Sequence, residues 1–277
     1  MKKKMLIVFG TRPEAIKMCP LVREFRKRGK MEVKVCVSGQ HREMLNQVLE
    51  LFDIIPEYDL KIMQPGQSLF DITSKVLPGI GNVLMEYKPD LVFVHGDTTT
   101  AFASALASFY LQIPVAHVEA GLRTNNIYSP FPEEFNRQAI SLVAKYHFSP
   151  TEMVGENLRR EGKCENSIYI TGNTVIDALK TTVKKDYKSE IIEWAKGSRL
   201  ILITAHRREN LGDPMNRMFC AIRKIAEEYE DVRMLYPMHP NPIVRDSAWK
   251  ILGGRDNIRL IEPLNAFDFH NLINHAY

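Results

Sequence analysis

Apolar strand-like runs alternate with helix-like segments along nearly the whole chain, and this alternation restricts its fold more than any other feature. The strand-like runs are continuous rather than alternating, as in KMLIVFG at 4–10 and DLVFVHGD at 90–97. Continuous runs are typical of parallel strands that helices cover on both faces. The pattern therefore predicts an α/β protein with doubly wound, Rossmann-like sheets.

The same patterns place the elements along the chain. Further strands are expected at 33–39, 113–121, 167–172, 199–206, 232–239 and 257–264. Helices are expected at 13–28, 41–52, 98–110, 174–183, 218–229, 244–252 and 267–277. The charge-rich segment 180–199 breaks the rhythm, so we expect two domains, at 1–172 and 173–277. The second domain has only three clear strands, and no further strand follows its last helix, so we expect this domain to be incomplete.

Composition excludes several classes of protein. A chain of 277 residues with 45% hydrophobic and 25% charged residues is typical of soluble globular proteins. The net charge is +4 with scattered basic residues, which fits an anionic small molecule and argues against nucleic acid. Neither a signal-peptide core nor a membrane-spanning run is present. Four dispersed cysteines predict free thiols in the cytoplasm.

Polar residues follow nearly every predicted strand. Ligands of α/β sheets bind outside the carboxyl ends of the strands, so these residues outline one cleft between the two domains. They are Thr11, Arg12, Pro13, Glu14, Gln40, His41, Arg42, His95, Gly96, Asp97, Glu119, Arg123, Asn173, His206, Arg207 and His239. The histidines His95, His117 and His206 come from separate strands without ligand spacing, so no metal site and no cofactor are expected.

The first strand leads into a glycine turn, Arg12, and a proline suited to a first helical position. A helix N-terminus here would offer free N–H groups to an anion, Arg12 could grip a phosphate, and Lys17 follows one turn later. Alternatively, Arg12 simply pairs with Glu14 or another carboxylate. Neither GxxxxGK[ST] nor GxGxxG is present.

Carboxylates follow the next strands. Asp97 precedes a helix, so a capping role for it or for the following threonines is the simplest interpretation. Glu119 ends a buried strand where no good helix start follows, and a buried carboxylate needs a partner such as Arg123. Glu133 and its neighbour Glu134 follow a proline, where a helix dipole favours acidic residues. His206 beside Arg207 is either a structural partner of a carbonyl or a ligand-facing donor.

Together these motifs suit proton transfer on a phosphorylated or nucleotide-linked substrate. They also resemble a known family. FGTRPEAIKMCPLV, HGDTTT, HVEAGLRT, YSPFPEEFNRQ, TGNTVIDAL and TAHRREN, in this order, are similar to the non-hydrolysing bacterial UDP-N-acetylglucosamine 2-epimerases. The resemblance runs from residue 4 to residue 277. It implies a GT-B-like fold and interconversion of UDP-N-acetylglucosamine and UDP-N-acetylmannosamine, a step that feeds polysaccharide biosynthesis.

The resemblance also implies roles for individual residues. The acid/base candidates are Asp97, Glu119 and Glu133, and His206 would stabilise the leaving diphosphate. The residues matched to substrate-binding positions are Arg12, Lys17, Arg137, Leu264 and Phe269. A second, regulatory UDP-N-acetylglucosamine site would use Gln40, Gln67, Glu133, Arg207 and His239. Gly66 stands where the bacterial pattern often has arginine, so this chain departs from the family pattern at that site.

Family chains continue beyond the position of Tyr277 with a glycine-serine loop that contributes to UDP binding and with further helices. This chain is therefore expected to be a C-terminally truncated form without epimerase activity on its own, and a homodimer when full length. Two alternatives stay open. One is a hydrolysing 2-epimerase that releases N-acetylmannosamine and UDP, and the other is a non-catalytic fragment that binds nucleotide sugars.

Overall fold

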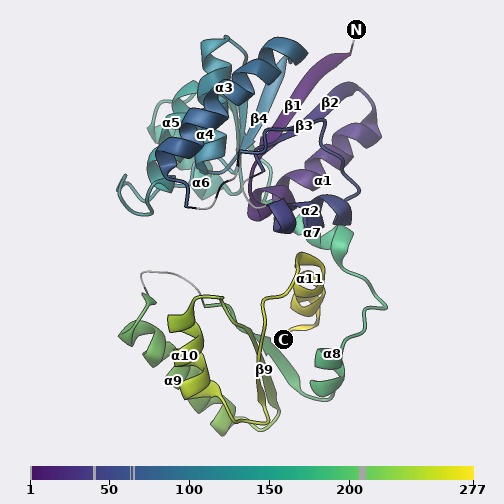
Figure 1. Ribbon diagram of the computed structural model, residues 1–277, viewed down its shortest axis with the longest axis vertical. Coiled ribbons are helices and arrows are strands. Elements are labelled where there is room, and N and C mark those ends of the chain that lie inside the picture. The colour runs from purple at the N-terminus through teal and green to yellow at the C-terminus, as the bar shows by residue number, and fades with distance from the viewer. Residues whose placement is uncertain (1, 40–41, 63, 65, 206–209) are drawn as a thin grey trace. The chain divides into compact units, whose positions relative to one another are not determined.

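The computed structural model describes residues 2–39, 42–62, 64, 66–205 and 210–277. It divides into two compact units, Met1–Thr181 and Thr182–Tyr277 (Figure 1). The domain boundary expected after residue 172, and the cleft expected between the domains, stay predictions.

The larger unit is built on a seven-stranded parallel sheet with strand order β3-β2-β1-β4-β5-β6-β7. The strands are β1 (Lys3–Phe9), β2 (Met31–Val37), β3 (Tyr58–Asp59), β4 (Leu91–His95), β5 (Val115–Val118), β6 (Ala144–Ser149) and β7 (Ile168–Ile170). The helices are α1 (Arg12–Arg28), α2 (Arg42–Leu51), α3 (Leu69–Tyr87), α4 (Thr99–Tyr110), α5 (Glu133–Val143), α6 (Glu152–Arg160) and α7 (Val175–Thr182).

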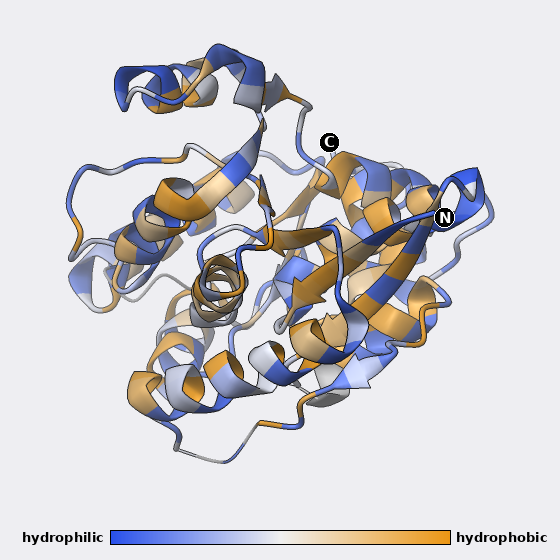
Figure 2. Cartoon of the chain, turned by 90° about the horizontal axis from the view of Figure 1, so that it is seen from above, coloured by the Kyte–Doolittle hydropathy of each residue, from blue (hydrophilic) through white to orange (hydrophobic). Residues whose placement is uncertain are grey.

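Helices cover both faces of this sheet, as its continuous apolar strands require. In β4, Val92 and Val94 belong to a buried cluster with residues of α3 and α4. The side chain between them, Phe93, packs against Phe25 of α1, with the ring centroids 5.3 Å apart and the rings tilted by 58°. Successive side chains of a strand point to opposite faces, so α1 and the α3–α4 pair lie on opposite sides. Apolar residues accordingly concentrate along the strands and on the helix sides facing them (Figure 2).

The direction of strand addition reverses between β1 and β4, which are neighbours in the sheet although β2 and β3 separate them in sequence. In open α/β sheets this switch point is where ligands bind, outside the carboxyl ends of the strands. The turn after β1 is very close-packed, because a Cβ on Gly10 would lie 2.1 Å from Ser38 Oγ. Only glycine fits there, which brings the start of α1 against the neighbouring strand ends.

The smaller unit has a three-stranded parallel sheet in the order β10-β9-β8. Its elements are α8 (Glu190–Trp194), β8 (Arg199–Leu202), α9 (Asp213–Glu228), β9 (Val232–Pro237), α10 (Pro242–Leu252), β10 (Ile258–Ile261) and α11 (Ala266–His275). Residues of α9 and α10 pack into one apolar cluster with the strands, and residues of α8 and α11 form another. The three strands expected in this region are confirmed among the described residues.

Several elements escaped the sequence patterns. The strand β6 has the sequence AKYHFS, in which polar and apolar residues are mixed, so it lacks the continuous apolar run of its neighbours. The two-residue strand β3 is too short to give any pattern. The helices α3 and α6 were not predicted either. A short helix, α8, lies inside 180–199, which we had expected to be only a connection.

Candidate functional site

The turn from β1 into α1 is organised by a buried glutamate rather than left open. Thr11 caps the helix, and Glu14 completes a reciprocal capping box. Glu14 Oε2 accepts hydrogen bonds from the backbone N–H of Gly10 at 3.0 Å and of Thr11 at 2.8 Å. Glu14 Oε1 accepts from the Thr98 hydroxyl at 2.8 Å. Burial raises the pKa of Glu14, against the opposing effect of these hydrogen bonds.

These contacts bear on two expectations about this turn. The N–H groups of Gly10 and Thr11 are not available to an anionic ligand, because both donate hydrogen bonds to the carboxylate of Glu14. Glu14 does not pair with Arg12 either, since its oxygens are used within the turn and by Thr98. Within the described part of the chain, the half-buried Arg12 forms no hydrogen bond or ion pair. Its guanidinium thus remains a candidate hydrogen-bond donor to an anionic ligand.

Glu119 follows β5 directly and adopts a left-handed backbone conformation, with a φ of 62°. Such a conformation is rare for a residue with a side chain and often marks a functional position. Its Oε2 atom lies 2.5 Å from Lys17 Nζ and accepts a hydrogen bond from Asn173 Nδ2 at 3.1 Å. The side chain is 15% exposed, so the carboxylate is held by partners while remaining partly accessible.

The partner expected for Glu119 was wrong. Arg123 instead pairs with Glu161, with Nε 2.6 Å from Oε1, and donates a second hydrogen bond to Ser141. The true partner, Lys17, comes from a different strand–helix unit, so no local sequence pattern connects it to Glu119.

Asp97 lies at the carboxyl end of β4, and it does not cap the following helix. Thr98 is the N-cap of α4, and its hydroxyl accepts from the N–H of Ala101 at 3.0 Å. The Asp97 carboxylate pairs instead with Arg137 of α5, with Oδ2 2.6 Å from Nη2. Burial raises the pKa of Asp97, and the charges of Glu133 and Glu119 raise it further, against the opposing effect of Arg137. A capping role therefore does not explain this carboxylate.

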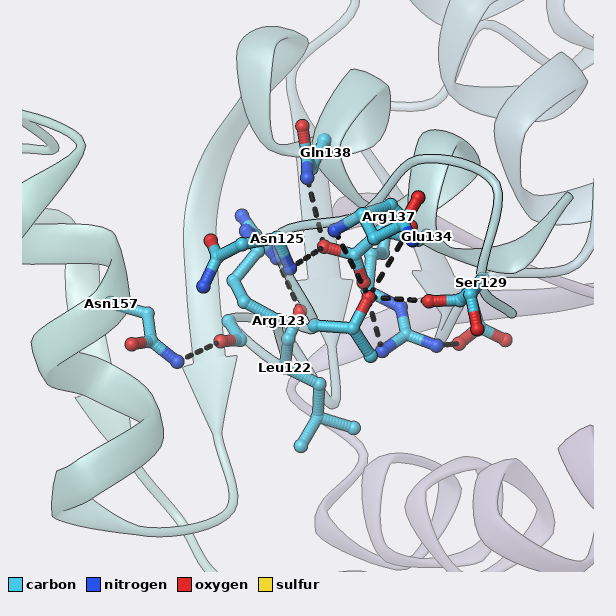
Figure 3. A network of polar contacts seen from close by, with 12 residues as sticks. Leu122, Arg123, Asn125, Ser129, Glu134, Arg137, Gln138 and Asn157 are labelled. Atoms are coloured by element: carbon cyan, nitrogen blue, oxygen red, sulfur yellow. Dashed lines mark hydrogen bonds and ion pairs between the residues drawn. The ribbon is translucent and has the colours of Figure 1, made fainter. Parts of the chain in front are cut away.

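The first turn of α5 carries Glu133 and Glu134, and the two have different surroundings. Glu134 is fully buried, and its Oε1 accepts hydrogen bonds from Gln138 at 2.8 Å and from the N–H of Asn125 at 3.1 Å (Figure 3). Arg137 lies 3.4 Å from its Oε2. Burial raises the pKa of Glu134, but these partners together outweigh burial and lower it. Glu134 is thus a structural anchor for the 119–132 loop, whereas Glu133 is half-buried beside Asp97.

Two buried neutral histidines lie under the strand ends. His117 Nε2 lies 2.7 Å from the carbonyl oxygen of Gly96, so this nitrogen carries the proton. His95 is 4% exposed, and neither ring nitrogen has a hydrogen-bond partner among the described residues. Its Nε2 lies 3.9 Å from Glu119 Oε2. Burial lowers the pKa of each histidine to about 3, so both are uncharged at neutral pH.

The structure thus brings five predicted residues of the larger unit together at neighbouring strand ends: Lys17, Asp97, Glu119, Glu133 and Arg137. Other predicted residues belong to the smaller unit. Leu264 packs at the edge of an apolar cluster, Phe269 is half-buried in α11, and His239 is exposed. The predicted residues Gln40, His206 and Arg207 lie outside the described residues.

The proposed regulatory residues show no ligand-ready arrangement in the described part of the chain. Gln67 uses its side-chain amide within its own loop, donating to the Ile62 carbonyl at 2.7 Å and accepting from the N–H of Gln64 at 2.9 Å. Gly66 has a φ of 73°, and a Cβ there would meet nothing within 4 Å. His239 Nδ1 accepts from the N–H of Asn241 at 3.1 Å. The regulatory role stays a prediction.

Three contributors, Glu14, His95 and Asn173, were expected at the polar strand ends but were assigned no role in binding or catalysis. Each stands in a polar strand-end segment, which was the only available signal. Among the described residues no group of three or more His, Cys, Asp or Glu is arranged to hold a metal ion. No described helix is long and apolar enough to cross a membrane.

Comparison with known proteins assigns the family. A family model described as UDP-N-acetylglucosamine 2-epimerase matches residues 23–277. A Bacillus subtilis (strain 168) protein named UDP-N-acetylglucosamine 2-epimerase is 54% identical over 270 residues, which cover 98% of this chain and 71% of that protein.

Solved structures agree with this assignment. A Listeria monocytogenes relative has 57% identity and a TM-score of 0.95, with 100% of this chain and 73% of that chain covered. UDP-GlcNAc 2-epimerase from Neisseria meningitidis, solved bound to UDP-GlcNAc, has 46% identity and a TM-score of 0.89, with 99% and 76% covered. The chain therefore belongs to the UDP-N-acetylglucosamine 2-epimerase family and shares its α/β, GT-B-like fold.

Proposed function

We propose that the reaction of this protein is the interconversion of UDP-N-acetylglucosamine and UDP-N-acetylmannosamine, by elimination and re-addition of UDP. Its family makes it an epimerase, and a relative solved with UDP-GlcNAc supports the substrate. One observation carries the chemistry. Two partly exposed carboxylates, Asp97 and Glu119, end the adjacent strands β4 and β5, and each is paired with a cation.

The reaction needs acid/base groups on both faces of the sugar at C2. The C2 proton is removed, and the electron pair it leaves expels UDP from C1, which gives 2-acetamidoglucal and free UDP on the enzyme. In the return step a proton is delivered to C2 from the other face while a UDP oxygen re-forms the bond to C1. Two carboxylates on neighbouring strand ends are suited to serve the two faces.

Asp97 and Glu119 are the strongest candidates for these roles. The raised pKa of Asp97 brings its titration closer to neutral pH, where a proton donor or acceptor works best. Glu119 is oriented by Lys17 and Asn173, and all contacts to it described above are made to Oε2. That leaves Oε1 as the oxygen available to exchange a proton. Glu133 lies close enough to influence Asp97 and is the third candidate.

Arg12 and Arg137 have separable roles in this proposal. Arg12, which lacks a carboxylate partner among the described residues, is suited to hold the diphosphate of UDP. Arg137 is already engaged by Asp97 and Glu134, so we assign it to orienting Asp97 rather than to gripping substrate. Leu264, Phe269 and His206 are assigned to UDP binding by the family resemblance alone. The resemblance is also our ground for proposing a homodimer, which light scattering would test. The four dispersed cysteines, without a disulfide pattern, are our ground for proposing a cytoplasmic location.

Product analysis separates this proposal from its alternatives. The protein is incubated with UDP-N-acetylglucosamine, and the reaction is followed by ³¹P and ¹H NMR. We expect UDP-N-acetylmannosamine to accumulate with its diphosphate intact until equilibrium. Free N-acetylmannosamine with stoichiometric UDP would instead identify a hydrolysing enzyme. Tight binding without any conversion would identify a nucleotide-sugar-binding protein and overturn the proposal.

A further inference from the structure

His95 is a buried side chain whose capacity for hydrogen bonds is not used among the described residues. It is the last residue of β4 and lies two positions before Asp97. Both ring nitrogens are buried and have no partner there. Burial of an unsatisfied polar group destabilises a fold, so natural proteins seldom keep one without a reason.

The nearest polar group indicates that reason. His95 Nε2 lies 3.9 Å from Glu119 Oε2, which is too far for a hydrogen bond but within reach of a small rotation of the carboxylate. Lys17 and Asn173 hold the same oxygen at 2.5 and 3.1 Å. The imidazole is therefore a third potential donor close to an oxygen that already has two.

The neighbouring histidine shows what a purely structural role looks like in this sheet. His117, on the adjacent strand β5, is also buried, but its Nε2 donates to the Gly96 carbonyl at 2.7 Å. That bond fixes the turn that connects β4 to Asp97. His95 has the same burial and the same neutral charge state, without such a bond among the described residues. The difference between them is the carboxylate of Glu119.

We propose that His95 is a positioning residue for Glu119, and that its Nε2–H donates to the Glu119 carboxylate when that side chain moves to react with substrate. A neutral donor can follow the carboxylate through proton gain and loss without strongly favouring either state. The ammonium of Lys17 favours the charged state alone. His95 would thus hold Glu119 in place at the stage where the carboxylate turns away from Lys17. This role rests on the proposed acid/base function of Glu119.

Two substitutions distinguish the two ring nitrogens. The amide nitrogen of glutamine can take the place of Nε2, and that of asparagine the place of Nδ1. His95→Gln should therefore keep kcat within about threefold, whereas His95→Asn should lower kcat by roughly 10- to 100-fold, as expected for a lost hydrogen bond to a charged group. KM should change little in both variants, because the substrate itself is not contacted.

The matched control is His147→Gln, which alters a buried neutral histidine on β6. The measured step is uptake of solvent deuterium at C2 in D₂O, together with the thermal midpoint of each variant. The same kcat in His95→Gln and His95→Asn, whether lowered in both or unchanged in both, would overturn the proposal. If wild type itself takes up no deuterium, the proposed function fails rather than the role of His95.

A measurement on wild type covers the case in which a variant does not fold. Imidazole ¹⁵N shifts of histidine-labelled protein report which ring nitrogen of each histidine carries a proton. We expect the Nε2–H form for His95 and a change in its Nε2 shift when substrate is added. The Nδ1–H form, or an Nε2 signal unaffected by substrate, would overturn the proposal.

Discussion

Replacing Glu14 by alanine should destabilise the larger unit. Replacing Asp71, the corresponding residue of an exposed capping box, by alanine should destabilise it much less. Glu14 is 2% exposed, and it joins the turn after β1 to Thr98 at the start of α4. In Glu14→Ala the buried N–H of Gly10 loses its acceptor, and no water can replace it easily. Asp71 forms the equivalent box with Ser68 at the start of α3, but its side chain is exposed to solvent. Water can therefore satisfy the groups freed in Asp71→Ala.

The size of the effect follows from these contacts. An unsatisfied buried N–H costs about 1–3 kcal/mol, and loss of a helix cap costs about 1 kcal/mol. Part of this loss is offset, because burial raises the pKa of Glu14 and its charged form is therefore strained in the folded state. We expect a net loss of about 2–3 kcal/mol for Glu14→Ala. Glu14→Gln should lose less, since the Thr98 hydroxyl can accept as well as donate.

Urea unfolding measures the difference. Both tryptophans of the chain, Trp194 and Trp249, lie in the smaller unit, so tryptophan fluorescence follows that unit. Far-UV circular dichroism follows both units, and the larger unit is read from the part of its change that the fluorescence does not share. With a denaturant dependence of about 2 kcal/mol per molar, Glu14→Ala should lower the midpoint by about 1 M or slightly more. Asp71→Ala should shift it clearly less. Equal shifts for the two variants would refute the role assigned to the buried amides.

Two further results follow from the geometry. Gly121→Ala should lower the free energy of unfolding by about 3 kcal/mol or more, because the φ of Gly121 is 97° and a Cβ there would lie 2.6 Å from the Val154 carbonyl oxygen. Gly162→Ala should lower it by only about 1 kcal/mol, because Gly162 has a φ of 77° but open space around it. Equal thermal midpoints for the two variants would contradict this difference. Arg137→Leu removes a charge that lowers the pKa of Asp97, so that pKa should rise and the limb of the pH–rate profile that Asp97 sets should move to higher pH. A limb that stayed in place or moved to lower pH would show that Asp97 does not set it.

The sequence predicted the positions of the site carboxylates better than their partners. Parallel strands end at one edge of a sheet, so Asp97 and Glu119 had to lie near each other once their strands were assigned. Pairing was not predictable in this way. Lys17 reaches Glu119 from the helix after another strand, and Arg137 reaches Asp97 from 40 positions along the chain. The sequence held no signal for these long-range choices.

Where neighbouring groups compete for one role, the sequence leaves the choice between them open. A cap on α4 from Asp97 or from the following threonines fits the sequence, and the structure assigns the cap to Thr98. An anion was expected at the N–H groups where α1 begins, but Glu14 accepts hydrogen bonds from those of Gly10 and Thr11. The strand β6 was missed for a different reason, because four of its six residues are partly or fully exposed and its apolar pattern is weak. Tertiary packing decides these cases, and it is not encoded within a short window of sequence.

Deuterium uptake at C2 in variants of the carboxylates tests the proposed chemistry most directly. The variants are Asp97→Asn and Glu119→Gln. The control is Asp90→Asn, because Asp90 is an exposed carboxylate just before β4 that pairs with Lys3 of β1. In D₂O, wild type and the control should place deuterium at C2 of both epimers. Each site variant should do so about 10²- to 10⁴-fold more slowly, while still binding UDP. Near-normal uptake in both site variants would contradict the assignment of Asp97 and Glu119 to proton transfer.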